Sequence, residues 1–269
     1  MYSFWEGAEE MFPESKAISV VTLNTWKGDG AYLDRIKLIQ EQAADLEADI
    51  MLLQEAFKAE SCGYDTAKYL AEKLGMAFAA QPARMKVRRV DDIEVMTTSG
   101  LAVLTHGKII SNEALLLDSD PNDGDRISQF VEIKLQNSQI LVVNTHLTHL
   151  ENRDHLRIKQ LNQTLNWISD NKKYDLIIFG GDLNCVPDSQ PVSWLLNTHL
   201  IETQEACHHL GRRFSTIDDG SDQKQVDYIF RLGNSRFRLE AVRRVFDLQC
   251  PTKNIYPSDH FGVWTRFSD

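Results

Sequence analysis

The chain has 269 residues, of which 42% are hydrophobic and 25% are charged, as is typical of a soluble globular protein with ample core material. Its 29 basic and 39 acidic residues give a net charge of -10, which argues against a protein whose main function is nonspecific binding to phosphate backbones. A nucleic-acid enzyme with a local basic rim stays compatible with this charge. We expect a single domain over 18–269, preceded by an N-terminal extension over 1–17.

Cysteine usage and the N-terminal residues suggest a cytoplasmic protein. Residues 1–12 contain three glutamates and no lysine or arginine, so they lack the charged head and apolar centre of a signal peptide. No apolar run is long enough to span a membrane. The four cysteines lack paired metal-type spacing, which favours free thiols in a reducing compartment. Cys185 directly follows Asn184, so we expect a packed thiol there; the alternative is a thiol whose oxidation disturbs the site.

The first two predicted strands end in polar side chains. The β-branched stretch Ile18 to Thr25 predicts a strand that ends at Asn24. From Tyr32 to Leu46, apolar residues recur at spacings of three and four, which predicts an amphipathic helix with Leu33 on its apolar face. Asp49 to Glu55 is a second buried strand. A strand, a helix and a strand in this order favour parallel pairing, so we expect Asn24 and Glu55 at the same edge of a sheet.

The next stretch is predicted to contain a helix, a basic loop and a meander of strands. Residues 64–74 read as a helix ended by Gly75, and 76–80 as a short strand. Residues 84–89 are the most basic in the chain; we expect a solvated loop, with a nucleic-acid patch as the alternative. Strands over 100–105, 108–117, 127–135 and 138–146 follow, as an antiparallel meander that ends at His146.

A buried strand over 176–179 follows a helix predicted over 153–171. Gly180 and Gly181 then break the strand, where the chain must turn or approach another group closely. Asp182 and Asn184 come next, two residues apart. In an extended stretch their side chains point the same way, so they could converge on a hydrated cation and its water.

The last third of the chain adds three polar residues at strand ends. A short helix over 189–196 and a polar loop over 214–225 precede a strand over 226–230, which has Asp227 near its start. Another strand is predicted over 240–247. A tight turn over 257–260 contains Asp259 and His260 and opens the last strand, over 261–267.

Polar residues therefore lie at many of the predicted strand ends. In chain order they are Asn24, Glu55, His146, Asp182 with Asn184, Asp227, and Asp259 with His260. Jointly they form the oxygen-rich, histidine-containing set that hydrolysis of a phosphate ester over a hard divalent cation needs.

Six motifs give this set a specific resemblance. They are Leu23-Asn24-Thr25-Trp26, Gln54-Glu55, Asn144-Thr145-His146-Leu147, Gly181-Asp182-Leu183-Asn184, Val226-Asp227-Tyr228-Ile229 and Ser258-Asp259-His260. In type and order they resemble the motif series of the endonuclease/exonuclease/phosphatase superfamily. The resemblance extends roughly from Ile18 to Phe267. It implies a DNase-I-like fold, a four-layer α/β sandwich of two mixed β-sheets flanked by helices.

The same resemblance implies a role for each residue. Glu55 would be the principal Mg²⁺ or Mn²⁺ ligand, and Asn24 would assist through its carbonyl oxygen or hold a phosphate oxygen with its amide. Asp259 would bind a second ion or polarise a water. Asp182 would orient and deprotonate the attacking water, and Asn184 would position the water or the phosphate. His146 and His260 would donate hydrogen bonds to the phosphate, with His260 held by Asp227. The general base stays open between Asp182 and His260.

The implied function is a metal-dependent phosphoester hydrolase, more specifically a phosphodiesterase that acts as a monomer. Superfamily members differ in substrate, and nucleic acid is one candidate. A sphingomyelinase-type or phosphatase-type activity on a lipid or small phosphoester is the alternative. A further alternative is a catalytically silent module that binds a phosphorylated ligand. The completeness of the polar set favours an enzyme.

Overall fold

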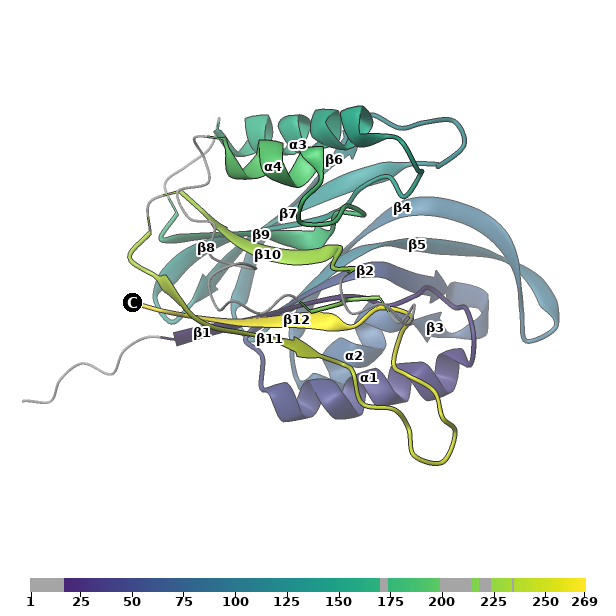
Figure 1. Ribbon diagram of the computed structural model, residues 1–269. Helices are drawn as coiled ribbons and strands as arrows, with labels where there is room; N and C mark the ends of the chain where they lie inside the picture. Colours follow the sequence, from purple (N-terminus) through teal and green to yellow (C-terminus); the bar gives the residue numbers. More distant parts are fainter. Residues whose placement is uncertain (1–16, 170–173, 199–213, 218–223, 234) are drawn as a thin grey trace, which may run out of the picture.

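Two mixed β-sheets lie face to face, and helices cover their outer faces (Figure 1). The computed structural model describes residues 17–169, 174–198, 214–217, 224–233 and 235–269. The predicted four-layer sandwich is confirmed. Most of the predicted extension over 1–17, the last two residues of the helix predicted over 153–171 and Cys207 lie outside the described residues.

Within these ranges the larger sheet has seven strands. Its order is β11 (Arg238–Val245), β12 (Gly262–Ser268), β1 (Ala17–Asn24), β2 (Ile50–Ala59), β5 (Ile93–Thr105) and β4 (Ala77–Val90), with the short β3 (Tyr64–Asp65) paired to β2. As predicted, β1 and β2 are parallel, and Asn24 lies opposite Gln54. The polar end of β1 therefore lies beside the stretch of β2 that contains Glu55.

The smaller sheet has five strands in the described part of the chain. Its order is β10 (Asp227–Leu232), β9 (Leu176–Asp182), β8 (Ser138–His146), β7 (Arg126–Leu135) and β6 (Lys108–Leu117). The turn between β7 and β8 contains Gln136 and Asn137 with φ angles of 48° and 63°, as tight hairpins favour. β8 and β9 are parallel, whereas β9 and β10 are antiparallel.

Helices cover the outer face of each sheet (Figure 1), two on each among the described residues. They are α1 (Tyr32–Leu46) and α2 (Thr66–Leu74) on the larger sheet, and α3 (Asp154–Ser169) and α4 (Gln190–Leu196) on the smaller one. α2 begins after Asp65, whose side chain accepts a hydrogen bond from the backbone N–H of Lys68. It ends at Gly75, whose φ of 66° suits glycine, as predicted.

Apolar residues fill the three interfaces between the four layers of the sandwich. Adjacent residues of β1 point to opposite faces, so Val20 packs between the two sheets and Val21 packs against α1 and α2. The layer between the sheets also contains Leu52, Val142, Ile178 and Val263. A third layer joins the smaller sheet to α3 and α4. Because every central strand is covered on both faces, the polar residues at the strand ends face one another across the edge of the core.

Three predictions about strands were wrong in part. The strand predicted over 100–105 belongs to β5, which pairs with β2 and β4 in the larger sheet, so the meander contains only β6, β7 and β8. β4 does not end at Ala80 but continues to Val90, and the basic stretch 84–89 is part of this strand. Pairing with β5 supplies the backbone hydrogen bonds that override its loop-like composition.

The buried face of α1 also differs from the prediction. Leu33 is 59% exposed, whereas Arg35 is only 2% exposed. Ile36, Ile39 and Ala43 are buried as expected. The helix has the predicted bounds, but its buried stripe is turned so that it includes a charged residue.

Candidate active site

The smaller sheet brings three of the predicted catalytic residues to one edge. β8 ends at His146 and β9 at Asp182, β10 begins at Asp227, and the strand register places Asp182 between the other two. Gly181 has a φ of 130°, and a Cβ atom there would lie 2.0 Å from the carbonyl oxygen of Thr145. The predicted close approach is confirmed, although both glycines lie within β9 and do not break it.

The larger sheet contributes Asn24, at the end of β1, and His260, just before β12. The Ser258 hydroxyl donates to the carbonyl oxygen of Asn24 at 2.7 Å, and the backbone N–H of His260 donates to that hydroxyl at 3.2 Å. These bonds fasten the turn over 257–260 to the end of β1. The turn therefore presents His260 to the smaller sheet.

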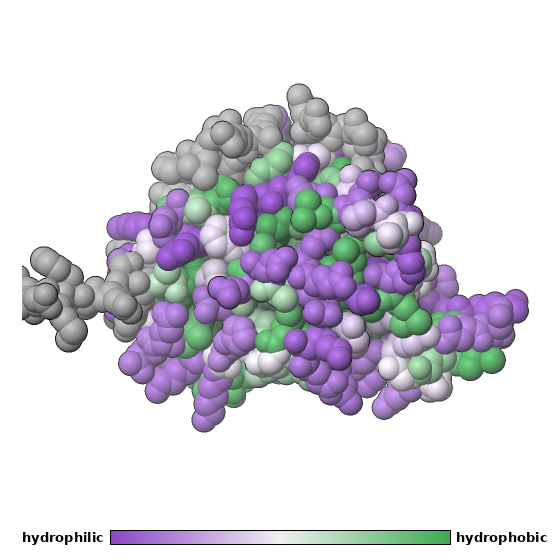
Figure 2. All heavy atoms as spheres, turned by 90° about the horizontal axis from the view of Figure 1, so that it is seen from below, coloured by the Kyte–Doolittle hydropathy of each residue, from purple (hydrophilic) through white to green (hydrophobic). Residues whose placement is uncertain are grey.

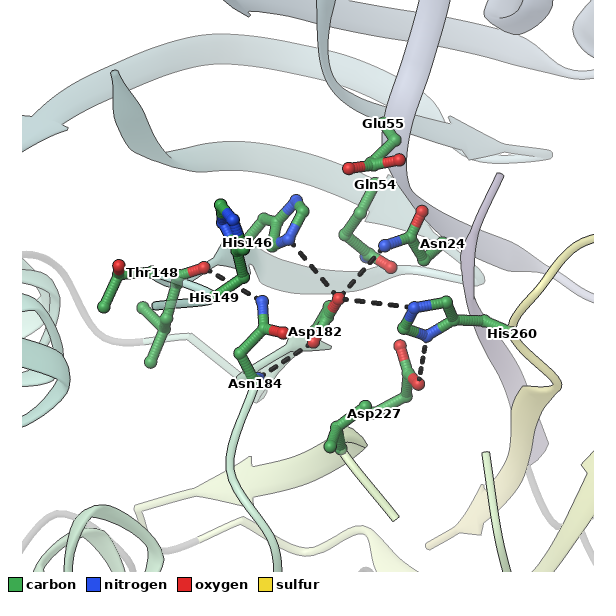
Figure 3. A network of polar contacts seen from close by, with 12 residues as sticks. Asn24, Gln54, Glu55, His146, Thr148, His149, Asp182, Asn184, Asp227 and His260 are labelled. Carbon is green, nitrogen blue, oxygen red and sulfur yellow. Dashed lines mark hydrogen bonds and ion pairs between the residues drawn. The ribbon is translucent and has the colours of Figure 1, made fainter. Parts of the chain in front are cut away.

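Asp182 is the centre at which these side chains meet (Figure 3). Its Oδ2 accepts a hydrogen bond from Asn24 Nδ2 at 3.0 Å and lies 3.3 Å from His146 Nε2 and 3.8 Å from His260 Nε2. The residue is 1% exposed. Burial and the nearby negative charge of Asp227 raise the pKa of Asp182. A raised pKa makes this carboxylate a stronger proton acceptor than an ordinary aspartate.

His260 is paired with Asp227. Its Nδ1 lies 2.9 Å from Asp227 Oδ2. Burial opposes the charged ring, but the attraction of Asp227, joined by Asp182, raises the pKa of His260 to about 10. The imidazole is therefore positively charged at neutral pH, and both ring nitrogens are hydrogen-bond donors.

His146 is in the opposite state. Burial and the positive charges of Arg126 and His260 lower its pKa well below the ordinary value for histidine. The ring is neutral at neutral pH and offers one N–H donor. The site thus contains one charged and one neutral imidazole on either side of the Asp182 carboxylate.

Asn184 does not continue β9. Its φ of 51° is left-handed, so the chain turns after Asp182. The prediction that Asp182 and Asn184 belong to one extended stretch is therefore wrong. The backbone N–H of Asn184 donates to Asp182 Oδ1 at 2.9 Å, and its Nδ2 donates to the carbonyl oxygen of Leu147 at 3.1 Å. Asn184 therefore lies at the site through a tight turn that also holds the Asp182 carboxylate.

Glu55 lies within β2 and not at its end. The pairing of β2 with β5 shifts register between Leu53 and Ala56, and Glu55 has a φ of 55°. A bulge of this kind re-aims a side chain within a continuous strand. Glu55 Oε1 lies 2.7 Å from Lys27 Nζ. In Figure 3 the Glu55 carboxylate lies apart from the contacts of Asp182.

The acidic and histidine side chains of the site form one compact group. Among the histidine, cysteine, aspartate and glutamate residues of the described ranges, one group of three has potential metal-ligand atoms within 4.8 Å of one another: Asp182, Asp227 and His260. Asp259 is exposed, and its Oδ1 lies 3.2 Å from the Ser258 hydroxyl oxygen. Desolvation of the carboxyl group and the negative charge of Glu55 raise the pKa of Asp259, whereas His260 acts in the opposite direction. Asn24 Oδ1 accepts from the backbone N–H of Trp26 at 3.1 Å.

The sequence analysis did not identify Arg35, whose side chain holds the loop after Asn24 through hydrogen bonds. Its guanidinium donates to backbone carbonyls of Thr25, Trp26, Lys27, Asp29 and Pro257, at 2.6 to 3.1 Å. It thereby joins the loop that carries Lys27 to the turn that carries His260. One signal was present: Arg35 precedes Ile39 by four residues, so it lies on the buried face of α1.

Arg126 is a second residue that the sequence did not single out. It is 4% exposed and donates to both carboxylate oxygens of Asp123, at 3.0 and 2.6 Å. With Lys27, Glu55, Arg84 and His146 it lines a cleft above the strand ends. Three positive side chains and the carboxylates of Glu55 and Asp125 thus border a cleft that includes Glu55 and His146 of the candidate site.

Comparison with known proteins agrees with this geometry. The model of the Endonuclease/Exonuclease/phosphatase family matches residues 21–260. The chain belongs to this family. Membership supports a phosphoesterase-type or nuclease-type function. The protein named angel from Drosophila melanogaster is 24% identical to this family member over 253 residues, which cover 83% of this chain and 68% of that protein.

Solved structures share the fold of this family member. An endonuclease/exonuclease/phosphatase family protein from Bacteroides thetaiotaomicron has a TM-score of 0.70 at 18% identity, covering 95% of this chain and 96% of that one. D. rerio TDP2 complexed with a single-strand DNA product has a TM-score of 0.69 at 18% identity, covering 94% and 99%. At these identities the likeness establishes the fold alone. Among the described residues of this family member, no helix is sufficiently long and apolar to cross a membrane.

Proposed function

We propose that the protein is a divalent-metal-dependent phosphodiesterase. The observation that carries this proposal is the convergence of Asn24, His146 and His260 on one carboxylate oxygen of Asp182. The two sheets place these donors around a buried acceptor. Such an arrangement can take a proton from a water and, on the same side, hold the oxygens of a phosphate.

Glu55, Asn24 and Asp259 would hold the cation. Their oxygens are the hard donors that Mg²⁺ and Mn²⁺ accept. The bulge in β2 aims Glu55 at the cleft, and its contact with Lys27 places the carboxylate beside positive charge. A bound divalent cation supplies neutralisation of the phosphate charge and a lower pKa for its water.

Asp182 is the proposed general base. With a pKa of about 10, His260 is already protonated at neutral pH and is poorly suited to accept a proton from water. Its charge suits it instead to donate a hydrogen bond to the phosphate as negative charge develops in the transition state. His146 is neutral and supplies a second donor, while Asn184 supports Asp182.

Nucleic acid is the proposed substrate class. Lys27, Arg84 and Arg126 line the cleft together with Glu55 and Asp125, so cations outnumber carboxylates there, which favours an anionic substrate. The complex of D. rerio TDP2 with a single-strand DNA product is a structural neighbour in keeping with this choice. We further propose that the protein acts as a monomer. The free thiols of Cys62, Cys185 and Cys250 support a location in the reducing cytoplasm.

A substrate panel tests the proposal. Purified protein is assayed with bis-p-nitrophenyl phosphate, single-stranded and plasmid DNA, p-nitrophenyl phosphate and sphingomyelin, each with Mg²⁺, Mn²⁺ or EDTA. We expect metal-dependent turnover of the diesters and of DNA. Turnover confined to sphingomyelin or the monoester would favour the alternative hydrolases. Binding of phosphorylated ligands without turnover would favour a silent module.

A further inference from the structure

A two-stranded arm projects from the larger sheet beside the cleft. It is formed by the outer parts of β4 and β5 and turns at Asp91 and Asp92, whose φ angles of 47° and 65° allow a tight hairpin. Figures 1 and 2 show the arm extending beyond the body of the molecule, with hydrophobic and hydrophilic side chains on it. The basic stretch 84–89 forms the outer part of β4.

A bulge decides which way the basic residues of this arm point. The pairing of β4 with β5 shifts register between Pro82 and Arg84, so Ala83 is an extra residue in β4. One extra residue exchanges the two faces of the strand beyond it. Arg84, Lys86 and Arg88 consequently share one face. Apolar side chains of Met85, Val87 and Met96, each more than half exposed, occupy the other face.

The basic face lines a groove. Its walls include Lys27, Arg84, Lys86 and Arg88, with Thr97 and Ser99 of β5. Lys27, Arg84 and Ser99 also line the cleft that contains Glu55 and His146. The groove is therefore continuous with the candidate active site and leads from it along the arm.

The charge of the groove is opposite to that of the protein. Four of its lining residues are cationic and, within the described ranges, none is a carboxylate, although the whole chain has a net charge of -10. Three of these cations have a carboxylate nearby: Lys27 lies 2.7 Å from Glu55, Arg88 lies 3.1 Å from Asp29 and Arg84 lies 3.8 Å from Asp123. No described carboxylate pairs with Lys86. Concentrating positive charge in one groove of an acidic protein creates a local site for an anion.

We propose that this groove binds the phosphodiester backbone of a single nucleic-acid strand that extends from the cleaved bond. This inference rests on the proposed function and adds a subsite to it. Alternate residues of a strand recur about every 6.7 Å, so the basic face presents a row of cations to a row of phosphates. A flat anionic membrane fits less well, because the exposed apolar side chains lie on the opposite face of the arm.

Binding of a strand without cleavage tests the inference. Fluorescence anisotropy of a labelled oligodeoxythymidylate is measured in EDTA over a range of KCl concentrations, with wild type, Lys86→Gln and Arg89→Gln. Arg89 is the matched control: it belongs to the same strand but its neighbour in space is Asp92 at the hairpin tip. We expect Lys86→Gln to weaken binding about fivefold at low salt and to lower the salt slope by about 0.7. Arg89→Gln should bind as wild type does.

Equal binding by wild type and Lys86→Gln, with unchanged melting temperatures, would overturn the inference, as would equal losses in both variants. Binding of wild type to phosphatidylserine vesicles and not to the oligonucleotide would mean that the groove does not bind nucleic acid. Lys86→Glu, which should weaken oligonucleotide binding further than Lys86→Gln, serves as a second variant should Lys86→Gln fail to fold.

Turnover of bis-p-nitrophenyl phosphate by wild type is measured separately. Its absence would reject the proposed hydrolase without affecting the binding result.

Discussion

Asp227 uses one carboxylate oxygen to hold His260 and leaves the other without a hydrogen-bond partner among the described residues. Oδ2 lies 2.9 Å from His260 Nδ1, whereas the buried Oδ1 has no such contact there. A buried carboxylate is costly unless it is compensated by charge or hydrogen bonds. The positive charge of His260 therefore stabilises Asp227 as much as Asp227 stabilises the charge of His260.

This mutual dependence predicts non-additive mutations. Asp227→Ala should remove much of the activity that His260→Ala removes, and the double variant should lose little more than His260→Ala alone. The measurement is kcat/KM on bis-p-nitrophenyl phosphate for the three variants at one metal concentration. Losses that add in free energy would instead mean that the two residues act independently.

The pH dependence of activity follows from the same pair. Because the pKa of His260 is raised to about 10 and the protonated ring is the active form, activity should fall as pH rises through about 10. Asp227→Asn removes the main attraction, so the alkaline limb should move to lower pH by about one unit or more. Profiles of kcat/KM against pH check this, with Glu240→Gln, whose exposed carboxylate is paired to Arg266, as a control. An alkaline limb at the same pH in wild type and Asp227→Asn would refute the assignment.

Glu55 and Asp182 should separate metal binding from catalysis. Glu55→Gln should weaken Mg²⁺ binding and activity together, whereas Asp182→Asn should lower turnover about 10²–10⁴-fold and leave Mg²⁺ binding largely intact. Calorimetric titration with Mg²⁺ and initial rates on the same preparations provide the two readouts. Near-normal rates for Asp182→Asn would show that another group is the base.

Arg35 should matter for stability and for the site. Arg35→Met leaves five backbone carbonyls without their donor, so we expect the free energy of unfolding to fall by about 3 kcal/mol. Lys37→Met on the exposed face of the same helix is the control and should change it by less than about 0.5 kcal/mol, because its contact with Glu41 is exposed. Urea unfolding monitored by circular dichroism measures both. Equal stability of the two variants would mean that the loop holds its shape without Arg35.

The thiol of Cys185 should resist modification in the folded protein. It is 5% exposed, and burial raises its pKa to about 12, so little thiolate forms at neutral pH. Hydrogen bonds with the side chain and backbone of Thr252 lower the pKa of Cys250. Iodoacetamide should therefore label Cys250 in the folded protein and should label Cys185 only after unfolding. Peptide mapping by mass spectrometry distinguishes the two sites. Rapid native labelling of Cys185 would contradict the packed-thiol prediction.

The sequence by itself determined most of the helices and strands and the set of polar residues at the strand ends. β-branched residues marked β1, continuous apolar runs marked β8 and β9, and the spacing of three and four residues predicted α1 with its observed bounds. These patterns are local, because burial on both faces or on one stripe is recorded in neighbouring residues. Glycine at position 181, before Asp182, similarly signalled a close approach of backbones.

Only the tertiary structure decided how these elements meet. Register irregularities aim Glu55 at the cleft and turn Lys86 toward the groove, and one extra residue in a strand leaves no periodic signal strong enough to place it. The buried Arg35 finds its acceptors in segments as distant as Pro257. The charges of His146 and His260 likewise depend on burial and on neighbours from other strands. The packing of the two sheets therefore makes one histidine neutral and the other positively charged.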